Sequence, residues 1–490
     1  MAYQLQSIDV FVRETPPNRM NFSIGKSEPT GEKAATAKRR PRAILLVRVS
    51  IRSHDGKTAT GLSGDRPSFG WLDKRQDIDP GEKLTMLLDL VEEARTIYLE
   101  NGKSFESAFS LWSVASEIVA QFGRDNNYED LMASYGSAIF ERAVIDACCR
   151  IEGRSFFEMV HENRLGITPE TVHPELEGFN LPLILPQKPN TKFYIRHTVG
   201  LSDPIDASEW PEESRVNDGE PETLKEYADR DGLRYFKIKI SGEPDHDLQR
   251  LEKIWHEVLV HINSPVVTLD GNEAYTDIAK FAAFVKRFEQ EVTGLFQHTR
   301  FIEQPFTRAL THDPETAATV AEISQRKPLE IDEADGATMA FKDAFAIGYS
   351  GTSHKNCKGV FKSLLNFGLC VHFATVSNRD AFLSGEDLSN MSIIPLHQDF
   401  VTLSVLGIDH CERNGHHYAY GMSHLFEVEK QALLKQNPDL YEERDGDVFL
   451  RIKNGKVETA SLQTIGFGSG TEPDWSTMPT LAIWREDNKV

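Results

Sequence analysis

Five charged residues recur along the second half of the chain at intervals that suit a barrel of alternating strands and helices. Each follows or ends a short run that predicts a β-strand. They are Lys239 in FKIKI, Asp270 in VVTLDGN, Glu303 in FIEQP, Asp332 in LEIDEAD and Lys355 in SGTSHKNCKG. Each interval between them is close to the length of one strand and one helix. Catalytic groups of such barrels sit at the carboxyl ends of the strands, so we expect these five side chains to meet at one mouth.

The three acidic residues of this series predict a site for a hard metal cation. Asp270, Glu303 and Asp332 would come from adjacent strands, and no histidine or cysteine joins them. Mg²⁺ binds carboxylate oxygens and keeps open positions for water or substrate, whereas Zn²⁺ prefers nitrogen and sulfur ligands. One such carboxylate alone could be a helix cap or half of a surface ion pair. Three in phase with the barrel period favour Mg²⁺.

Two lysines on one predicted strand favour proton transfer. Lys237 and Lys239 are separated by a single residue, so both side chains point to the same face of the strand. Ammonium groups that close repel each other, and the pKa of each is expected to fall from about 10.4. A lysine tuned in this way can act as a general base near neutral pH. The alternative is an edge strand with a solvated charged face, which the flanking apolar residues of YFKIKI disfavour.

A third lysine would approach the substrate from the opposite side. Lys355 is the candidate, and Lys358 in the same segment competes with it. This set suits removal of a proton next to a carboxylate, a step that leaves a dianionic enediolate. Mg²⁺ would bind the substrate carboxylate and stabilise that charge while one lysine takes the proton. The lysine opposite would return a proton, remain near the enolate as a cation, or assist a leaving group.

Eight short apolar runs in the second half of the chain would supply the strands that position these groups. Helical stretches separate the earlier runs, an alternation typical of a parallel, closed (β/α) barrel. The runs cover residues 193–199, 235–240, 265–269, 300–302, 328–331, 344–349, 369–374 and 393–396. Helices are less clearly patterned after the sixth run. We therefore expect an α/β catalytic domain over residues 186–425.

The part of the chain before this barrel, residues 1–185, predicts a separate α+β capping domain. Residues 4–12 and 42–52 read as strands, by alternation and β-branched content. Three later stretches carry apolar residues at helical spacing. They are residues 81–100, 104–122 and 129–150.

Two further segments lack a clear pattern of their own. Residues 14–40 are polar and rich in Pro, Gly, Lys and Thr. A connection of that length without secondary structure is usually a functional lid or disordered. Residues 426–490 are polar and mixed, and we expect them to pack back on the capping domain.

Composition and charge narrow the class of partner. The chain has 54 basic and 75 acidic residues, a net charge of −21, and an acidic surface argues against nucleic acid. No apolar run approaches the length of a membrane span, which needs roughly 18 residues or more, and the N-terminus lacks the pattern of a signal peptide. Five cysteines without a CxxC pair suit the reduced thiols of a cytoplasmic protein. A small molecule is the expected partner.

The ordered set FKIKI, LDGN, IEQP and IDEAD resembles the enolase superfamily, and within it the branch of mandelate racemase and muconate lactonizing enzyme. NRMNFSIG and PRAILLVRVSIRSHDG look like the opening of that family's capping domain, and SAIFERAVIDACCRIEGRSFFEMV resembles the helix before its barrel. The resemblance covers about residues 5–425. It implies a capping domain followed by a modified TIM barrel, (β/α)₇β, in a homo-oligomer. Residues 14–40 and 58–73 would form the specificity lid.

The resemblance also implies a role for each lysine. Lys239 would be the second-strand base, Lys237 its neighbour that faces the carboxylate and lowers its pKa, and Lys355 the sixth-strand acid or base. The family's sixth strand usually runs into Lys-Pro or a similar turn, whereas SGTSHKNCKG leaves the register of Lys355 against Lys358 open. The seventh-strand histidine of the family's racemases has no clear match, because His372 comes too early.

The remaining implied roles concern the metal and the reaction. The Mg²⁺ ligands would be Asp270, Glu303 and Asp332, supported by Glu333 and Asn272. The activity would be that of a Mg²⁺-dependent lyase or isomerase on a carboxylate substrate: dehydration, cycloisomerisation, racemisation or epimerisation, or ammonia loss. The alternative is a catalytically inactive relative that binds carboxylates or other proteins, which the unusual sixth strand and the long C-terminal segment motivate.

Histidines outside this series fit the proton-transfer hypothesis less well. His410, His416 and His417 in HCERNGHHYAYG could form a metal cluster, but their spacing is not helical and the glycine before the pair indicates a loop. A solvated loop or a loop at the substrate rim is favoured. Of Arg196 and His197 on the first barrel strand, alternation does not say which faces the barrel interior.

Overall fold

The capping domain is built on a three-stranded antiparallel sheet. A computed structural model describes residues 2–20, 42–377 and 379–490 of the chain. Strands β1 (Tyr3–Glu14) and β2 (Ala43–Ser53) confirm the two predicted strands, and β3 (Thr58–Asp65) pairs with β2 along its whole length. The first half of the segment assigned to the lid by sequence, residues 58–73, is therefore a sheet strand. Of the other predicted lid segment, 14–40, residues 21–40 lie outside the described residues.

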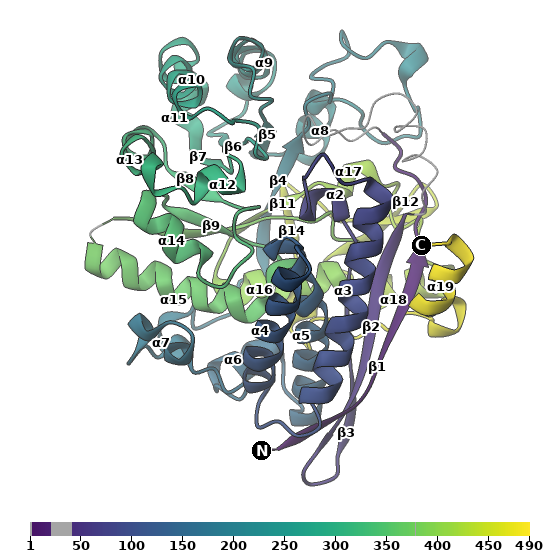
Figure 1. The fold of residues 1–490 in the computed structure, drawn as a ribbon. Helices are drawn as coiled ribbons and strands as arrows, with labels where there is room; N and C mark the ends of the chain where they lie inside the picture. Colours follow the sequence, from purple (N-terminus) through teal and green to yellow (C-terminus); the bar gives the residue numbers. More distant parts are fainter. Residues whose placement is uncertain (1, 21–41, 378) are drawn as a thin grey trace.

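Three helices confirm the helical predictions (Figure 1). They are α3 (Pro80–Asn101), α4 (Ala108–Asp125) and α5 (Asp130–Glu152). The first and third lie on one face of this sheet, and the second packs against those two. The start of α3 is set by Asp79, whose side chain accepts a hydrogen bond from the backbone N–H of Gly81. Strand β3 approaches α5 so closely that a Cβ on Gly61 would lie 2.0 Å from the carbonyl oxygen of Ala143. Glycine at this position thus permits the contact of sheet and helix.

Eight parallel strands form the closed barrel. In chain order they are β4 (Lys192–Val199), β5 (Tyr235–Lys239), β6 (Val266–Asp270), β7 (Thr299–Glu303), β8 (Leu329–Ile331), β9 (Gly351–His354), β10 (Phe382–Gly385) and β11 (His410–Arg413). Each pairs with the next, and β11 pairs with β4 to close the ring. The architecture is the expected capping domain followed by a modified (β/α) barrel.

The first five predicted barrel strands are confirmed, but the last three were placed on helices. The runs at 344–349, 369–374 and 393–396 belong largely to α14 (Ala340–Ile347), α15 (Val360–Ser377) and α16 (Ile394–Leu406). These helices are buried on most of their surface, and every residue of α16 is buried. A helix buried all round shows no polar face and so cannot be told from a buried strand by periodicity.

The other helices that separate the barrel strands are more amphipathic. They are α8 (Leu224–Asp231), α9 (Pro244–Glu257), α10 (Ile278–Glu291), α11 (Thr293–His298), α12 (Arg308–Thr311) and α13 (Ala317–Arg326). Among the described helices, α15 alone is long and apolar enough to cross a membrane by length and composition. Of its residues, 61% are buried inside the protein, where α15 packs against α7 (Leu181–Ile184) and α5.

The C-terminal segment contacts both the barrel and the capping domain. It contains α18 (Glu427–Gln436), β12 (Tyr441–Arg444), β13 (Asp447–Leu450), β14 (Lys456–Glu458) and α19 (Leu481–Asn488). Strand β14 pairs antiparallel with the beginning of β4. Helix α19 lies beside β1 (Figure 1), where the indole N–H of Trp484 donates to Glu14 at 3.0 Å. Buried Arg13 of β1 forms an ion pair with Glu429 of α18 at 2.6 Å.

Candidate active site

Lysines of β5 and carboxylates of the next two strands meet inside the barrel. The Lys237 ammonium lies 2.9 Å from Oδ2 of Asp270 and 2.7 Å from Oε2 of Glu303. The Lys239 ammonium lies 2.5 Å from the same oxygen of Asp270. All four side chains are buried. Alternation along β5 therefore places both lysines on the inner face, against the ends of β6 and β7.

Two further carboxylates complete the surroundings of Lys237. Its ammonium lies 2.7 Å from Glu386, directly after β10, and 3.2 Å from Glu412 on β11. Burial alone would lower the pKa of Lys237, but the charges of Asp270, Glu303 and the two further carboxylates more than offset it and raise the pKa well above its ordinary value. The prediction that ammonium repulsion lowers this pKa is therefore wrong for this arrangement.

The opposite flank of the site is formed around Asp332, which follows β8. The Lys355 ammonium lies 2.5 Å from one of its oxygens and 4.2 Å from the centre of the Trp71 ring. The Lys358 ammonium lies 3.3 Å from the other oxygen of Asp332 and donates to Ser353 at 2.6 Å. Both candidate lysines thus contact the same carboxylate, and in this structure the indole face covers Lys355.

Each lysine on this flank has a different set of neighbours. Lys358 also pairs with Asp335 at 3.3 Å. Burial alone would lower the pKa of Lys355, Asp332 raises it, and the ammonium of Lys237 opposes that rise. The net pKa of Lys355 is raised. Of these two lysines, Lys355 is therefore the one that interacts electrostatically with Lys237 on β5.

These contacts arrange the predicted series along an arc across the barrel. Strands β5, β6, β7, β8 and β9 are neighbours in that order. The groups at their ends follow the order Lys239, Asp270, Glu303, Asp332 and Lys355. A lysine therefore stands at each end of a row of three carboxylates, and each lysine contacts the outermost carboxylate on its side.

Asn272 and Glu333 lie just outside this arc and contact each other. The backbone N–H of Asn272 donates to Asp270 at 2.8 Å, and its side-chain amide donates to Glu333 at 2.9 Å. Lys74 of the capping domain donates to Glu333 at 2.6 Å and to the carbonyl of Asn272 at 2.9 Å. The segment after α2 (Phe69–Leu72) thereby holds the outer side of the arc.

Sequence reasoning left Arg196 open against His197 and missed three charged residues inside the barrel: Glu330, Glu386 and Glu412. Arg196 of β4 forms a buried ion pair with Glu386, so it is Arg196, and not His197, that faces the interior. Glu386 and Glu412 continue the series after Lys355, each about one strand and one helix beyond the charged residue before it. Correct placement of the last two strands would have revealed them.

Three buried carboxylates of the interior lie close enough together to hold a cation. The carboxylates of Glu303, Glu330 and Glu386 each offer an oxygen within 4.8 Å of the others. Burial, together with Asp270 and Glu386, raises the pKa of Glu303 well above its ordinary value. Oε2 of buried Glu330 has no hydrogen-bond partner among the described residues. Such crowding of carboxylates fits a hard cation, although this trio shares only Glu303 with the predicted ligands.

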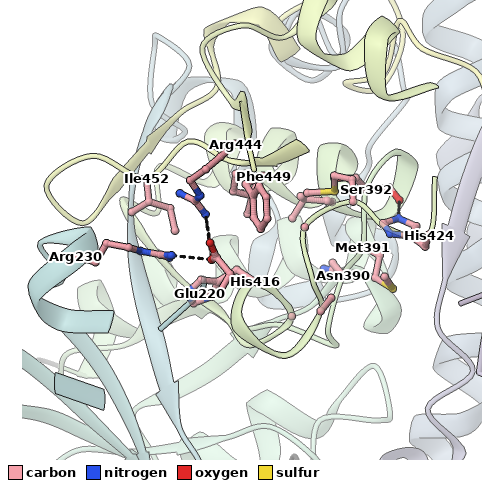
Figure 2. A pocket seen from close by; sticks show the side chains of 16 residues that line it. Glu220, Arg230, Asn390, Met391, Ser392, His416, His424, Arg444, Phe449 and Ile452 are labelled. Atoms are coloured by element: carbon pink, nitrogen blue, oxygen red, sulfur yellow. Dashed lines mark hydrogen bonds and ion pairs between the residues drawn. The ribbon is translucent and has the colours of Figure 1, made fainter. Parts of the chain in front are cut away.

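The mouth of the barrel is closed by the capping domain. The Lys237, Lys239 and Lys355 side chains are at most 5% exposed, and Trp71 lies over the last of them. A separate pocket lies outside this mouth, between the loop after β4, α17 (Gly415–Tyr418) and the β12–β13 hairpin (Figure 2). It contains none of the predicted catalytic groups.

The histidines near the end of the barrel are packed and not solvated. His410 begins β11, and its ring contacts Arg196. His417 in α17 is 3% exposed, and His416 is half-buried. Of the two expectations for this loop, the solvated one is wrong, because β4 and α8 cover this turn. A place at the substrate rim stays a prediction. His372, considered for the seventh strand, lies on α15.

Known proteins match this chain in structure but not in sequence. No family model matches the sequence, and no curated protein matches it. A mandelate racemase/muconate lactonizing enzyme from Bordetella bronchiseptica matches with a TM-score of 0.59, over 97% of this chain and 99% of that chain, at 12% identity. The chain has the fold of the mandelate racemase/muconate lactonizing enzyme branch of the enolase superfamily.

Two further solved structures with this enolase-superfamily fold carry ligands. A dipeptide epimerase from Cytophaga hutchinsonii, complexed with Mg and D-Ala-L-Val, has a TM-score of 0.56 over 98% of this chain and 99% of that chain, at 12% identity. An enolase from Mycobacterium smegmatis, complexed with tartrate, has a TM-score of 0.56 over 99% of this chain and 96% of that chain, at 13% identity. In this chain, Trp71 lies over Lys355 after β9, and Lys74 contacts Asn272 and Glu333, which follow β6 and β8.

Proposed function

We propose that the protein is a Mg²⁺-dependent enzyme that removes the proton next to a carboxylate of a small-molecule substrate. The observation that carries this proposal is the arc of three carboxylates with a lysine at each end. A group that takes a proton and a group that gives one, on opposite sides of a bound carboxylate, suit a lyase or an isomerase. No observation favours the alternative of an inactive binding protein.

The three carboxylates of the arc, Asp270, Glu303 and Asp332, would hold the cation. When bound, Mg²⁺ supplies positive charge that opposes the negative charge which a substrate carboxylate gains as the neighbouring proton leaves. Asn272 and Glu333 support this role through their contacts with Asp270 and with each other.

Lys239 and Lys355 would move the proton at their Nζ atoms. Each is now paired with a carboxylate of the arc, Asp270 or Asp332. If those carboxylate oxygens hold the cation, they no longer serve as ion-pair partners of the two lysines. Either lysine can then accept a proton from the side of the substrate that it faces. Lys237, held by four carboxylates, stays a cation near the reacting carboxylate.

Trp71 and Lys74 would exclude water from the reaction. Both come from the capping domain and lie over or beside the arc. Exclusion of water strengthens the electrostatic interactions within the site.

We include in this proposal a cytoplasmic homo-oligomer, with a capping domain over 1–185, a barrel over 186–425 and a C-terminal segment over 426–490.

Deuterium exchange tests the proposed proton transfer. The protein is incubated with Mg²⁺ in D₂O and with both enantiomers of hydroxy acids, acid sugars and dipeptides, and α-deuterium is measured by mass spectrometry. We expect exchange on at least one acid. Lys239→Ala should lower the rate of exchange on one enantiomer by about 100-fold or more, and Lys355→Ala should do the same for the other enantiomer. Lys358→Met is the matched control and should retain exchange at saturating Mg²⁺.

Three outcomes would count against parts of the proposal. Full exchange in Lys239→Ala would remove the assigned base. Loss of deuterium exchange in Lys358→Met, with retention in Lys355→Ala, would assign the proposed role of Lys355 to Lys358. Mg²⁺ binding at the barrel without exchange on any acid would favour the inactive alternative.

A further inference from the structure

Three histidines meet on the outer side of the barrel, away from the predicted catalytic arc. Neighbouring residues of β4 show which way its side chains point, because Arg196 and Thr198 contact Glu386 and Glu412 in the interior. His197 between them points outward. There its ring lies 5.2 Å from that of His416 and 4.3 Å from that of His417, between ring centres.

The spacing of the ring nitrogens suits a tetrahedral metal. Nδ1 of His197 and Nε2 of His416 are 3.4 Å apart. Two nitrogens bonded to Zn²⁺ at about 2.0–2.1 Å in tetrahedral geometry are about 3.4 Å apart. The three ligand atoms lie within 4.8 Å of one another, so His417 needs to approach by about 1.4 Å at most to reach that spacing.

Hydrogen bonding fixes the tautomer of His416. Its Nδ1 lies 2.6 Å from the carbonyl oxygen of Arg413. A carbonyl only accepts, so Nδ1 carries the proton and Nε2 presents its lone pair toward His197. Histidine ligands of metals commonly donate their other N–H in this way. A direct hydrogen bond from His197 at 3.4 Å would be longer than the usual range.

His417 has the polar atoms of a ligand without the partners of an ordinary buried histidine. It is 3% exposed, and neither ring nitrogen has a hydrogen-bond partner among the residues that the structure describes. Nε2 lies 3.9 Å from Oδ2 of Asp203, which accepts hydrogen bonds from Tyr418 and Gly200. At that distance Asp203 does not hydrogen-bond the ring, so a nitrogen of His417 remains available to bind a metal.

The charge state of the three rings also favours a metal. Burial lowers the pKa of each, and neighbouring rings of the cluster further lower the pKa of His197 and of His417. Neutral imidazole is the form that binds metals. The nearby guanidinium groups are already paired: Arg19 with Asp218 at 2.5 Å, and Arg230 with Glu220 at 2.7 Å.

We propose that His197, His416 and His417 form a second metal site, outside the barrel, for a divalent transition metal of the Zn²⁺ type. Three imidazoles and no thiolate suit Zn²⁺, Co²⁺ or Ni²⁺ in preference to Mg²⁺. His416 also lines the pocket in Figure 2, beside Glu220 and its two arginines, so an ion and a fourth ligand of water can reach it. The ion links β4, the first strand of the barrel, to the turn after β11, the last strand.

Cobalt titration of the full chain tests this site. Protein stripped with a chelator is titrated with Co²⁺, which absorbs strongly in the visible range when four-coordinate and weakly in an octahedral oxygen site. We expect strong absorption that saturates at one Co²⁺ per chain. His416→Ala should abolish it. His424→Ala is the matched control, because His424 lines the same pocket but its ring bonds the carbonyl of Ser392 at 2.7 Å.

A second pair of measurements separates this site from the barrel and from misfolding. The double variant Asp270→Asn/Glu303→Gln should keep the strong absorption. X-ray absorption of wild-type protein loaded with one Zn²⁺ should show scattering from three imidazoles, a result that needs no variant. Absence of the strong cobalt spectrum in wild type, its persistence in folded His416→Ala, or fewer than two imidazoles around Zn²⁺ would overturn the proposal.

Discussion

The ammonium group of Lys355 lies 4.2 Å from the centre of the Trp71 ring, although Trp71 belongs to the capping domain and Lys355 follows a barrel strand. The ring is 6% exposed and the lysine 4%. An indole face attracts a cation most strongly where water is excluded. The capping domain therefore contributes directly to the electrostatics of the proposed site.

Replacement of Trp71 should impair proton transfer more than stability. Trp71→Leu removes the aromatic face and opens the mouth to water, so we expect kcat/KM for α-proton exchange to fall about 10-fold. Trp71→Phe keeps an aromatic face and should lose less than about 3-fold. Trp475→Leu is the control, since this indole packs on Phe11 of the capping sheet. Equal losses in Trp71→Leu and Trp475→Leu would show that the effect is only structural.

Removal of the ammonium of Lys237 should destabilise the protein in a Mg²⁺-dependent manner. Lys237→Met leaves four carboxylates without their shared cation, and breaking a buried ion pair in this way costs about 3–5 kcal/mol. Unfolding in urea measures the loss with and without saturating Mg²⁺. We expect Mg²⁺ to narrow the difference from wild type, because the cation replaces the missing charge.

Lys327→Met provides the comparison for that experiment. Lys327 is also a buried lysine, but within the described part of the chain its hydrogen bonds go to the carbonyls of Phe296 and Thr299 and not to carboxylates. Its loss should therefore cost the same with and without Mg²⁺. If Mg²⁺ leaves the loss of stability in Lys237→Met unchanged, the four carboxylates around Lys237 do not bind the metal.

His397 should make the protein less stable in acid. Burial lowers its pKa to about 3, below about 6.5 in the unfolded chain. Between these values the unfolded chain binds a proton that the folded protein does not, so the free energy of unfolding falls as pH falls. His397→Asn loses this dependence, and its stability deficit should shrink by about 1.4 kcal/mol between pH 7.5 and pH 5.5.

Chemical denaturation at the two pH values gives this difference. The variant should retain part of the contact with Tyr441, whose hydroxyl lies 2.8 Å from Nε2 of His397. His246→Asn is the control, because this side chain is 63% exposed. A His397→Asn deficit that is the same at both pH values would contradict the assigned burial effect.

The sequence predicted β6, β7 and β8 because each of their apolar runs leads into a single charged group, Asp270, Glu303 or Asp332. Strands β10 and β11 escaped prediction for the opposite reason. They are short and read FLSG and HCER, and polar atoms of Ser384 and Glu412 face the interior, where they bond Glu330 and Thr198. Their polarity is satisfied by charges from other strands, which local patterning does not reveal.

The charge state of Lys237 could not be predicted for a related reason. Its closeness to Lys239 follows from strand geometry, but Glu386 and Glu412 reach it from the last two barrel strands, far away along the chain. Long-range contacts of this kind decide the sign of a pKa shift. The spacing of Asp270, Glu303 and Asp332, by contrast, depends only on the regular strand–helix repeat.

The ring of carboxylates around Lys237 has a consequence for how this protein could change over evolutionary time. A substitution of any one of these charged residues leaves its partners buried without a counter-charge, so the charged interior of the barrel tolerates single changes poorly. Trp71 and Lys74 are joined to the site by fewer contacts and come from a different part of the chain. New substrate specificities would thus arise first through changes in the capping segment, while the charged residues around Lys237 remain unchanged.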